Sequence, residues 1–350
     1  MYMSLKRSAA LLLSIAGLFV HAPDSQAQFL IKKTLNNQLD LSNNHLSSSS
    51  ALSSLLDPGN TTPGLAQKPK TAIDRLNLTS PRYAQSAEPT SPPPDKSQYN
   101  LFNPTPRKLW RDFSTDRPDK TETPFTVDAG RFTMEADLFV YTKDIDRPND
   151  TTTESYNYFV PNFKVGLTNN VDLQVIPQVY NVVSTRTGNQ PAQRVSGFGD
   201  TTVRVKVNFW GNDGGNTALG MMPFVKIPTS QNGIGNGSVE GGIIIPFAVK
   251  LSETWDVGMQ TELDLNANGG GSYNVGFVNT ISFGHELSDK WSTYFELYTN
   301  TGAERGFAAT FDTGLKYLSA ENVQLDAGVN IGLTEAAEAI QPFLGLSVRF

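Results

Sequence analysis

The chain has 350 residues, of which 18% are charged, and its formal net charge is −6. It contains no cysteine, which excludes disulfides, thiolate metal sites, cysteine nucleophiles and acylation of a lipoprotein-type cysteine. The acidity is mild and the sequence has no basic block, so no nucleic acid is expected as a partner.

Residues 1–27 are predicted to be a cleaved signal peptide. Lys6 and Arg7 precede an apolar run from Ala9 to Val20, and the small residues Ser25 to Ala27 provide a cleavage site. The apolar run is too short to span a membrane, and no later stretch has the roughly 20 consecutive apolar residues that a spanning helix needs. We therefore expect export without a helical anchor.

Residues 28–108 are rich in Ser, Asn, Pro and Thr and show no lasting period, which predicts a disordered periplasmic extension. Residues 109–129 differ in composition and are expected to form an ordered lead-in segment, tucked like a plug into the mouth of the domain that follows. The lead-in segment carries a charged motif: Thr115, Asp116, Arg117, Pro118 and Asp119.

Alternation of apolar and polar residues dominates residues 130–350. Between residues 322 and 333, every second residue is apolar and the residues between are polar or Gly, which gives a strand one apolar and one polar face. Twelve such segments can be counted up to Phe350. The recurrence predicts an all-β fold, a transmembrane antiparallel β-barrel of about 12 strands, with lipid outside and water inside.

In these segments, charged residues occur only at the alternate positions that also carry the polar residues. Lipid against the other face would explain this, because placing Lys or Arg at the bilayer midplane destabilises a barrel by about 2–4 kcal/mol. The charged side chains expected to face the lumen are Glu135, Asp137, Lys164, Asp172, Arg204, Lys206, Lys226, Glu240, Lys250, Glu262, Asp264, Glu296, Asp312, Lys316 and Asp326.

The connections alternate in length. Short links follow every second predicted strand, whereas others are longer, notably 143–155 and 184–196. Bacterial outer-membrane barrels have short periplasmic turns, longer external loops and an even number of strands. The sequence therefore predicts the bacterial outer membrane as the location, with outer-membrane lipid as a partner. Four prolines inside predicted strands conflict with this pattern, since each removes a ladder donor: Pro161, Pro177, Pro223 and Pro246.

Two stretches resemble known sequences. The carboxy-terminal residues 344–350, which alternate and end in Phe350, resemble the assembly signal of outer-membrane barrels, which implies the barrel-assembly machinery as a partner. Residues 113–122 and 126–132 resemble the opening of a family of outer-membrane transporters named for the MetA pathway of phenol degradation. The resemblance extends from about residue 110 to the end, and implies passage of small solutes, aromatic or hydrophobic ones included.

Each candidate site has a structural alternative. The charges of Asp116, Arg117, Asp119 and Lys120 would either gate the pore or form a salt-bridged turn, and the second is favoured. The lumen charges would either bind a solute or hold one another in a cross-strand network; both remain open. The slight acidic excess favours cations or neutral solutes.

An enzyme is not expected. Nucleophilic serine chemistry needs a base beside the serine, and His285 is the only histidine of the predicted barrel, at outward parity near the periplasmic end. Glycines near 235 and 270 precede no helical pattern, so they indicate loops rather than a phosphate site. No His or Cys cluster suggests a metal, and no cofactor is expected.

The sequence thus predicts an outer-membrane channel or transporter for a small-molecule solute. The alternative is a structural or adhesion barrel without transport; a barrel lipase or protease is the least favoured.

Overall fold

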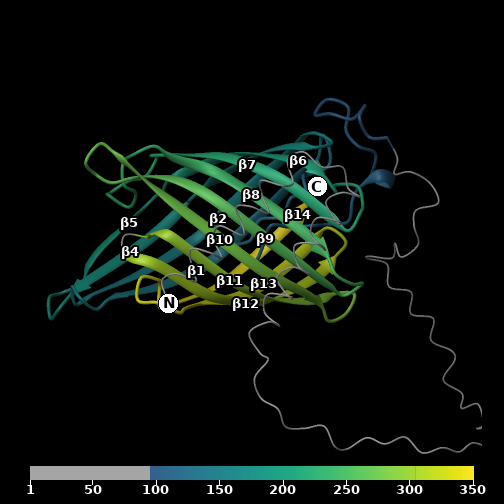
Figure 1. Ribbon diagram of the computed structural model, residues 1–350. Coiled ribbons are helices and arrows are strands. Elements are labelled where there is room, and N and C mark those ends of the chain that lie inside the picture. The colour runs from purple at the N-terminus through teal and green to yellow at the C-terminus, as the bar shows by residue number, and fades with distance from the viewer. Residues whose placement is uncertain (1–94, 304) are drawn as a thin grey trace, which may run out of the picture. The chain divides into compact units, whose positions relative to one another are not determined.

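The computed structural model describes residues 95–303 and 305–350. The predicted signal peptide and residues 28–94 of the predicted extension lie outside these residues. The described elements, shown in Figure 1, are the short 3-10 helix η2 (Arg107–Leu109), β1 (Phe132–Asp146), β2 (Thr151–Thr168), β3 (Val171–Pro177), β4 (Tyr180–Thr187), β5 (Gln193–Gly197), β6 (Thr201–Trp210), β7 (Thr217–Ile227), β8 (Glu240–Lys250), β9 (Trp255–Ala267), β10 (Tyr273–Glu286), β11 (Trp291–Ala303), β12 (Gly306–Ala320), β13 (Val323–Gly332) and β14 (Ile340–Arg349).

The strands form one closed antiparallel barrel. β1 pairs with β14 on one side and with β2 on the other, so the sheet closes on itself. β3 and β4 both pair with β2, while β6 pairs with β3 and β5 pairs with β4. β3 and β4 therefore form one interrupted strand, and β5 and β6 form a second. The wall has twelve strands when each of these is counted once. The predicted fold class is confirmed. No helix of the described residues is long and apolar enough to cross a membrane.

The two faces of the wall have opposite chemistry. On β13, Leu325 and Ile331 are 43% and 41% exposed, whereas Gln324, Asp326 and Asn330 are at most 7% exposed. Closure of the sheet encloses the second set, so polar side chains surround the lumen and apolar ones form the exterior. An apolar exterior of this kind is what the hydrocarbon of a bilayer covers.

A bulge in β1 changes part of the predicted alternation. The register with β14 shifts between Asp137 and Phe139, and an extra residue in one strand turns the following side chains to the other face. Phe139 is paired with Leu344, which is 51% exposed, and Val140 with Phe343, which is buried. Strict alternation through residues 132–140 predicts Val140 on the apolar outer face; that prediction is wrong, because alternation alone does not register an inserted residue.

The strand prolines lie where one ladder is interrupted. Pro161 and Pro177 border the gap between the β2–β3 and β2–β4 pairings. Pro223 lies at a gap in the β6–β7 ladder, and Pro246 lies at a gap in the β7–β8 ladder, while the opposite ladder of each continues. The missing N–H groups thus coincide with missing pairings, and the barrel tolerates the prolines without a free edge.

The connections fall into two sets. The turns after β2, β6, β8, β10 and β12 share one end of the barrel with the carboxy terminus, whose Phe350 N–H donates to the Phe132 carbonyl at 2.9 Å. We call this the short-turn end; it lies at the right in Figure 1. At the opposite end, most of the predicted loops 143–155 and 184–196 are strand. That prediction of loops is wrong, because the strand pairings of β1 with β2 and of β4 with β5 continue into both stretches.

Candidate functional site

The chain before β1 is attached to the short-turn end. Lys96 Nζ donates to Asp213 Oδ1 at 2.6 Å, and Asn100 forms a bridge with Thr168. Residues 95–108 are therefore ordered, and the predicted boundary of disorder at residue 108 is too late. The reason is tertiary: the stretch lacks a period of its own, and its order comes from polar contacts with the barrel turns.

Arg111 is the entry point of the lead-in segment (109–129). Its guanidinium donates to Asp213 Oδ1 at 3.0 Å, to the Asn169 carbonyl at 2.7 Å and to the Thr126 carbonyl at 3.0 Å. Partial burial alone would raise the pKa of Asp213, but the hydrogen bonds that its carboxylate accepts from Arg111, Lys96 and Asn169 lower it to about 2. Arg111 precedes the charged motif and Thr126 follows it, and the two residues are hydrogen bonded to each other. The segment therefore enters and leaves the lumen at the same end of the barrel.

Asp116 lies between two lysines of the inner wall. Lys206 Nζ of β6 donates to Asp116 Oδ1 at 2.6 Å, and Lys164 of β2 forms an ion pair with the same carboxylate. Lys164 also donates to Glu135 of β1 at 2.5 Å, and Glu135 accepts the backbone N–H of Asp116 at 3.0 Å. All four side chains are at most 7% exposed. A third buried carboxylate, Asp172 of β3, is paired with Lys206 in the β3–β6 register and is 1% exposed, so the two lysines are surrounded by carboxylates.

Arg117 points toward the opposite side of this cluster. Its guanidinium donates to Asp326 Oδ1 of β13 at 2.7 Å and forms an ion pair with Asp137 of β1. The neighbouring strand β14 provides space: a Cβ on Gly345 would lie 2.0 Å from Arg117 Nη2. A larger residue at position 345 would therefore have to displace the guanidinium.

The two residues that follow the charged motif contact another part of the wall, on β10, β11 and β12. Lys120 Nζ lies 3.4 Å from Asp312 Oδ2 and 4.3 Å from the centre of the Tyr298 ring. Thr121 Oγ1 donates to Glu296 Oε1 at 2.5 Å and lies 2.6 Å from Thr280 Oγ1.

Glu122 completes the contacts with an ion pair to Arg204 of β6, and its backbone N–H donates to Gln260 Oε1 at 2.8 Å. The lead-in segment therefore crosses the lumen. It forms hydrogen bonds or ion pairs with side chains of β1, β2, β6, β9, β10, β11, β12 and β13.

These contacts change the interpretation of the motif. The favoured prediction was a turn held by its own ion pairs, but the ion pairs of Asp116, Arg117 and Lys120 go to the barrel wall. That prediction is wrong, because the partners are more than fifteen residues away in sequence. Sequence reasoning also left out Glu122, Gln260 and Thr280, although the inward parity of the last two was visible.

The other predicted lumen charges are only partly brought together. Asp172 accepts the Val127 N–H at 3.0 Å and so contacts the lead-in segment. Lys316 acts electrostatically on Asp119. Four others pair among the wall strands or turns: Lys226 with Glu240, Lys250 with Glu253, and Glu262 with Gln260. Asp264 is paired in the β9–β10 register with Gly276.

His285 and Trp255 lie at the short-turn end. Their rings stack with centres 4.1 Å apart, and Nδ1 of His285 lies 3.1 Å from the Thr254 carbonyl. A second ring pair, Trp291 and Tyr317, lies on the neighbouring hairpin with centres 4.6 Å apart. Aromatic rings in such positions form the girdle of a membrane barrel at the interface with water.

A family model described as "Putative MetA-pathway of phenol degradation" matches residues 115–350. The chain belongs to this family. The match begins at Thr115, the first residue of the charged motif, so it covers the lumen-crossing residues together with the whole barrel. A closed antiparallel barrel with an apolar exterior and a polar lumen is the architecture of bacterial outer-membrane proteins, and the protein resides in the outer membrane.

Solved structures of several outer-membrane proteins are similar to this chain. The COG4313 outer membrane channel from Pseudomonas putida F1 is 13% identical, with a TM-score of 0.49, over 68% of this chain and 100% of that chain. A KdgM porin is 10% identical, with a TM-score of 0.37, over 63% and 99%. The CymD monoaromatic hydrocarbon channel is 9% identical, with a TM-score of 0.36, over 63% and 88%. We transfer no residue role from these distant structures. No curated protein matches the sequence.

Proposed function

We propose that the protein is an outer-membrane channel for small solutes, and that the lead-in segment closes it at the short-turn end. The observation that carries this proposal is the complete crossing of the lumen by residues 115–122, with ion pairs to opposite walls. Solutes pass when the segment withdraws toward the periplasm.

An apolar part of the inner wall supports the proposal that the solutes are aromatic or hydrophobic molecules. Met222 and Ile244 are at most 4% exposed and lie on the inner parity of β7 and β8. Phe224 has the same parity, and its ring lies against Gly242, where a Cβ would be 2.8 Å from Cε1. This apolar strip becomes a surface for a hydrophobic solute only when the lead-in segment withdraws, because Met222 and Ile244 are buried in the closed barrel. The family description, which refers to phenol degradation, agrees with this solute class.

A reversible disulfide tests whether the segment is the gate. The chain has no cysteine, so Thr121→Cys together with Thr280→Cys adds only one possible bridge, at side chains whose oxygens are 2.6 Å apart. We expect the oxidised double variant to block solute entry into liposomes, and reduction to restore the wild-type rate. Each single variant, treated in the same way, is the matched control.

Two outcomes would contradict the proposal. Equal flux in the oxidised and reduced double variant would mean that solutes bypass the segment. A barrel lacking residues 28–128 that folds but passes neither ions nor solutes in a planar bilayer would leave the structural or adhesion barrel as the better explanation. A liposome-swelling panel of sugars, organic acids and phenols then defines the solute class.

A further inference from the structure

The outer face of β1, β2 and β4 carries a band of aromatic rings. Tyr141 and Tyr156 have ring centres 5.2 Å apart, Phe139 and Tyr158 are 5.4 Å apart, and Tyr158 and Tyr180 are 6.0 Å apart. Tyr158 and Tyr180 are 42% and 47% exposed. Their shared parity, opposite to that of the hydrogen-bonded Asn157 and Asn181, places the rings outside the barrel.

The height of this band matches the outer interface of the membrane. Tyr141 is the tenth residue of β1 counted from the short-turn end, and Tyr158 is the eleventh residue of β2. About 9–11 residues of a tilted strand cross the hydrocarbon core. The rings therefore lie where aromatic residues border the headgroups, and outward side chains farther along these strands extend into the headgroup layer.

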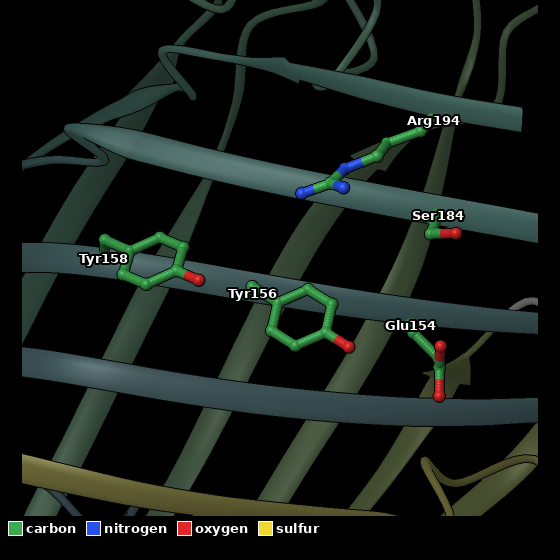
Figure 2. A pocket seen from close by; sticks show the side chains of 5 residues that line it. All are labelled: Glu154, Tyr156, Tyr158, Ser184 and Arg194. Atoms are coloured by element: carbon green, nitrogen blue, oxygen red, sulfur yellow. The ribbon is translucent and has the colours of Figure 1, made fainter.

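A hollow of about 170 Å³ lies at this level and is lined by Glu154, Tyr156, Tyr158, Ser184 and Arg194. Figure 2 shows the five side chains on the same side of three neighbouring strands, with the Arg194 guanidinium extending toward the tyrosines. Ser184 is paired with Arg194 in the β4–β5 register, and with Glu154 in the β2–β4 register. The residues are thus held by ladders rather than by a loop.

The charge around the hollow is predominantly basic. Lys143 of β1 is paired with Glu154 and points outward as Glu154 does. Arg186 lies two residues after Ser184 on β4, so it also points outward, on the same face as Arg194. Glu154 already accepts the Tyr141 hydroxyl at 2.8 Å. Within residues 95–303 and 305–350, the Arg194 guanidinium has no hydrogen bond or ion pair. An exposed arginine beside tyrosine rings is suited to a phosphate on a sugar, because guanidinium and phosphate form paired charge-assisted hydrogen bonds.

We propose that this hollow binds the phosphorylated sugar headgroup of an outer-leaflet glycolipid of the lipid A type. Arg194 holds the phosphate, Tyr156 and Tyr158 pack against the sugar, and Ser184 hydrogen bonds to it. The glycolipid, rather than a soluble sugar phosphate, is the occupant because the hollow faces away from the lumen and directly adjoins the hydrocarbon band. This binding does not depend on transport; it requires only the outer-membrane location.

Native mass spectrometry of the full chain in detergent tests the proposal, with bisphosphorylated lipid A, monophosphoryl lipid A and phosphatidylglycerol as probes. We expect the bisphosphorylated form to bind most tightly. Arg194→Gln should weaken its binding about tenfold, the loss expected for charge-assisted hydrogen bonds, and Arg194→Lys should recover only part of it. Arg107→Gln, which removes an exposed arginine at the short-turn end, is the matched control.

Folding of each variant is checked by its heat-dependent mobility in gels, so that a misassembled barrel is not scored. Unchanged lipid A binding in folded Arg194→Gln would overturn the proposal. Equal losses in Arg194→Gln and Arg107→Gln would indicate general charge attraction, and would overturn it too. So would phosphatidylglycerol binding as tightly as lipid A, or a soluble sugar phosphate competing at equal concentration.

Discussion

The ion pairs inside the lumen and those at the end opposite the short turns differ in what they contribute to the protein. Asp116 and Lys206 have side chains that are 7% and 1% exposed, whereas Arg147 and Glu335 are 67% and 78% exposed. Breaking a buried pair leaves an uncompensated charge and costs about 3–5 kcal/mol. An exposed pair contributes about 0–1 kcal/mol. The buried ion pairs between the lead-in segment and the wall therefore anchor the segment in the lumen, whereas the exposed pair has little effect on stability.

The largest effect should follow from Asp116→Ala. The substitution removes the carboxylate that forms ion pairs with both Lys164 and Lys206, and we expect the free energy of unfolding to fall by about 3–5 kcal/mol. Guanidinium unfolding in lipid vesicles measures the change. A loss below 1 kcal/mol, on the order of a surface pair, would show that the lead-in segment is not anchored here.

Gly345→Ala should release the anchor that Arg117 forms with β1 and β13. The new methyl group would fall 2.0 Å from Arg117 Nη2, and such overpacking costs about 1–3 kcal/mol. We expect higher single-channel conductance, because Arg117 must leave Asp326 and Asp137. Gly270→Ala, whose Cβ would meet only Asn268 Oδ1 at 3.5 Å, should behave as wild type. Equal conductance in the two variants would argue against Arg117 as an anchor.

The anchor at Asp213 should depend on acid pH. Its pKa is lowered from 3.8 to about 2 in the folded protein, so its stabilising contribution is complete above pH 3.8 and is lost as the pH falls toward 2. Hydrogen exchange of residues 95–112, measured at pH 5 and pH 2.5, should show reduced protection at the lower value. Asp213→Asn should remove this difference; if the variant retains it, another group is responsible.

The smallest effect is expected for Glu335→Ala. Its exposed pair with Arg147 lies 3.4 Å apart, and we expect a change of about 0–1 kcal/mol in the free energy of unfolding. The same guanidinium unfolding used for Asp116→Ala provides the comparison. A loss as large as that of Asp116→Ala would remove the distinction between the two regions.

Some parts of the molecule could be predicted from the sequence and others could not. The barrel was predictable because lipid excludes charge from every second residue, a local signal that each strand repeats. The bulge at Leu138 was not, since it inserts one residue without altering composition. The partners of Arg117 were also hidden: Asp137 lies 20 residues away and Asp326 lies 209 residues away.

The sequence by itself determined the all-β barrel, its polar and apolar faces, and the presence of a distinct charged segment before the first strand. Only the tertiary structure decided that this segment crosses the lumen and that each strand proline lies at an interrupted ladder. It also revealed the hollow formed by side chains of β2, β4 and β5 on the outer face. The physical reason is range: alternation reports the solvent on each side of one strand, whereas pairing between distant charges exists only after the barrel closes.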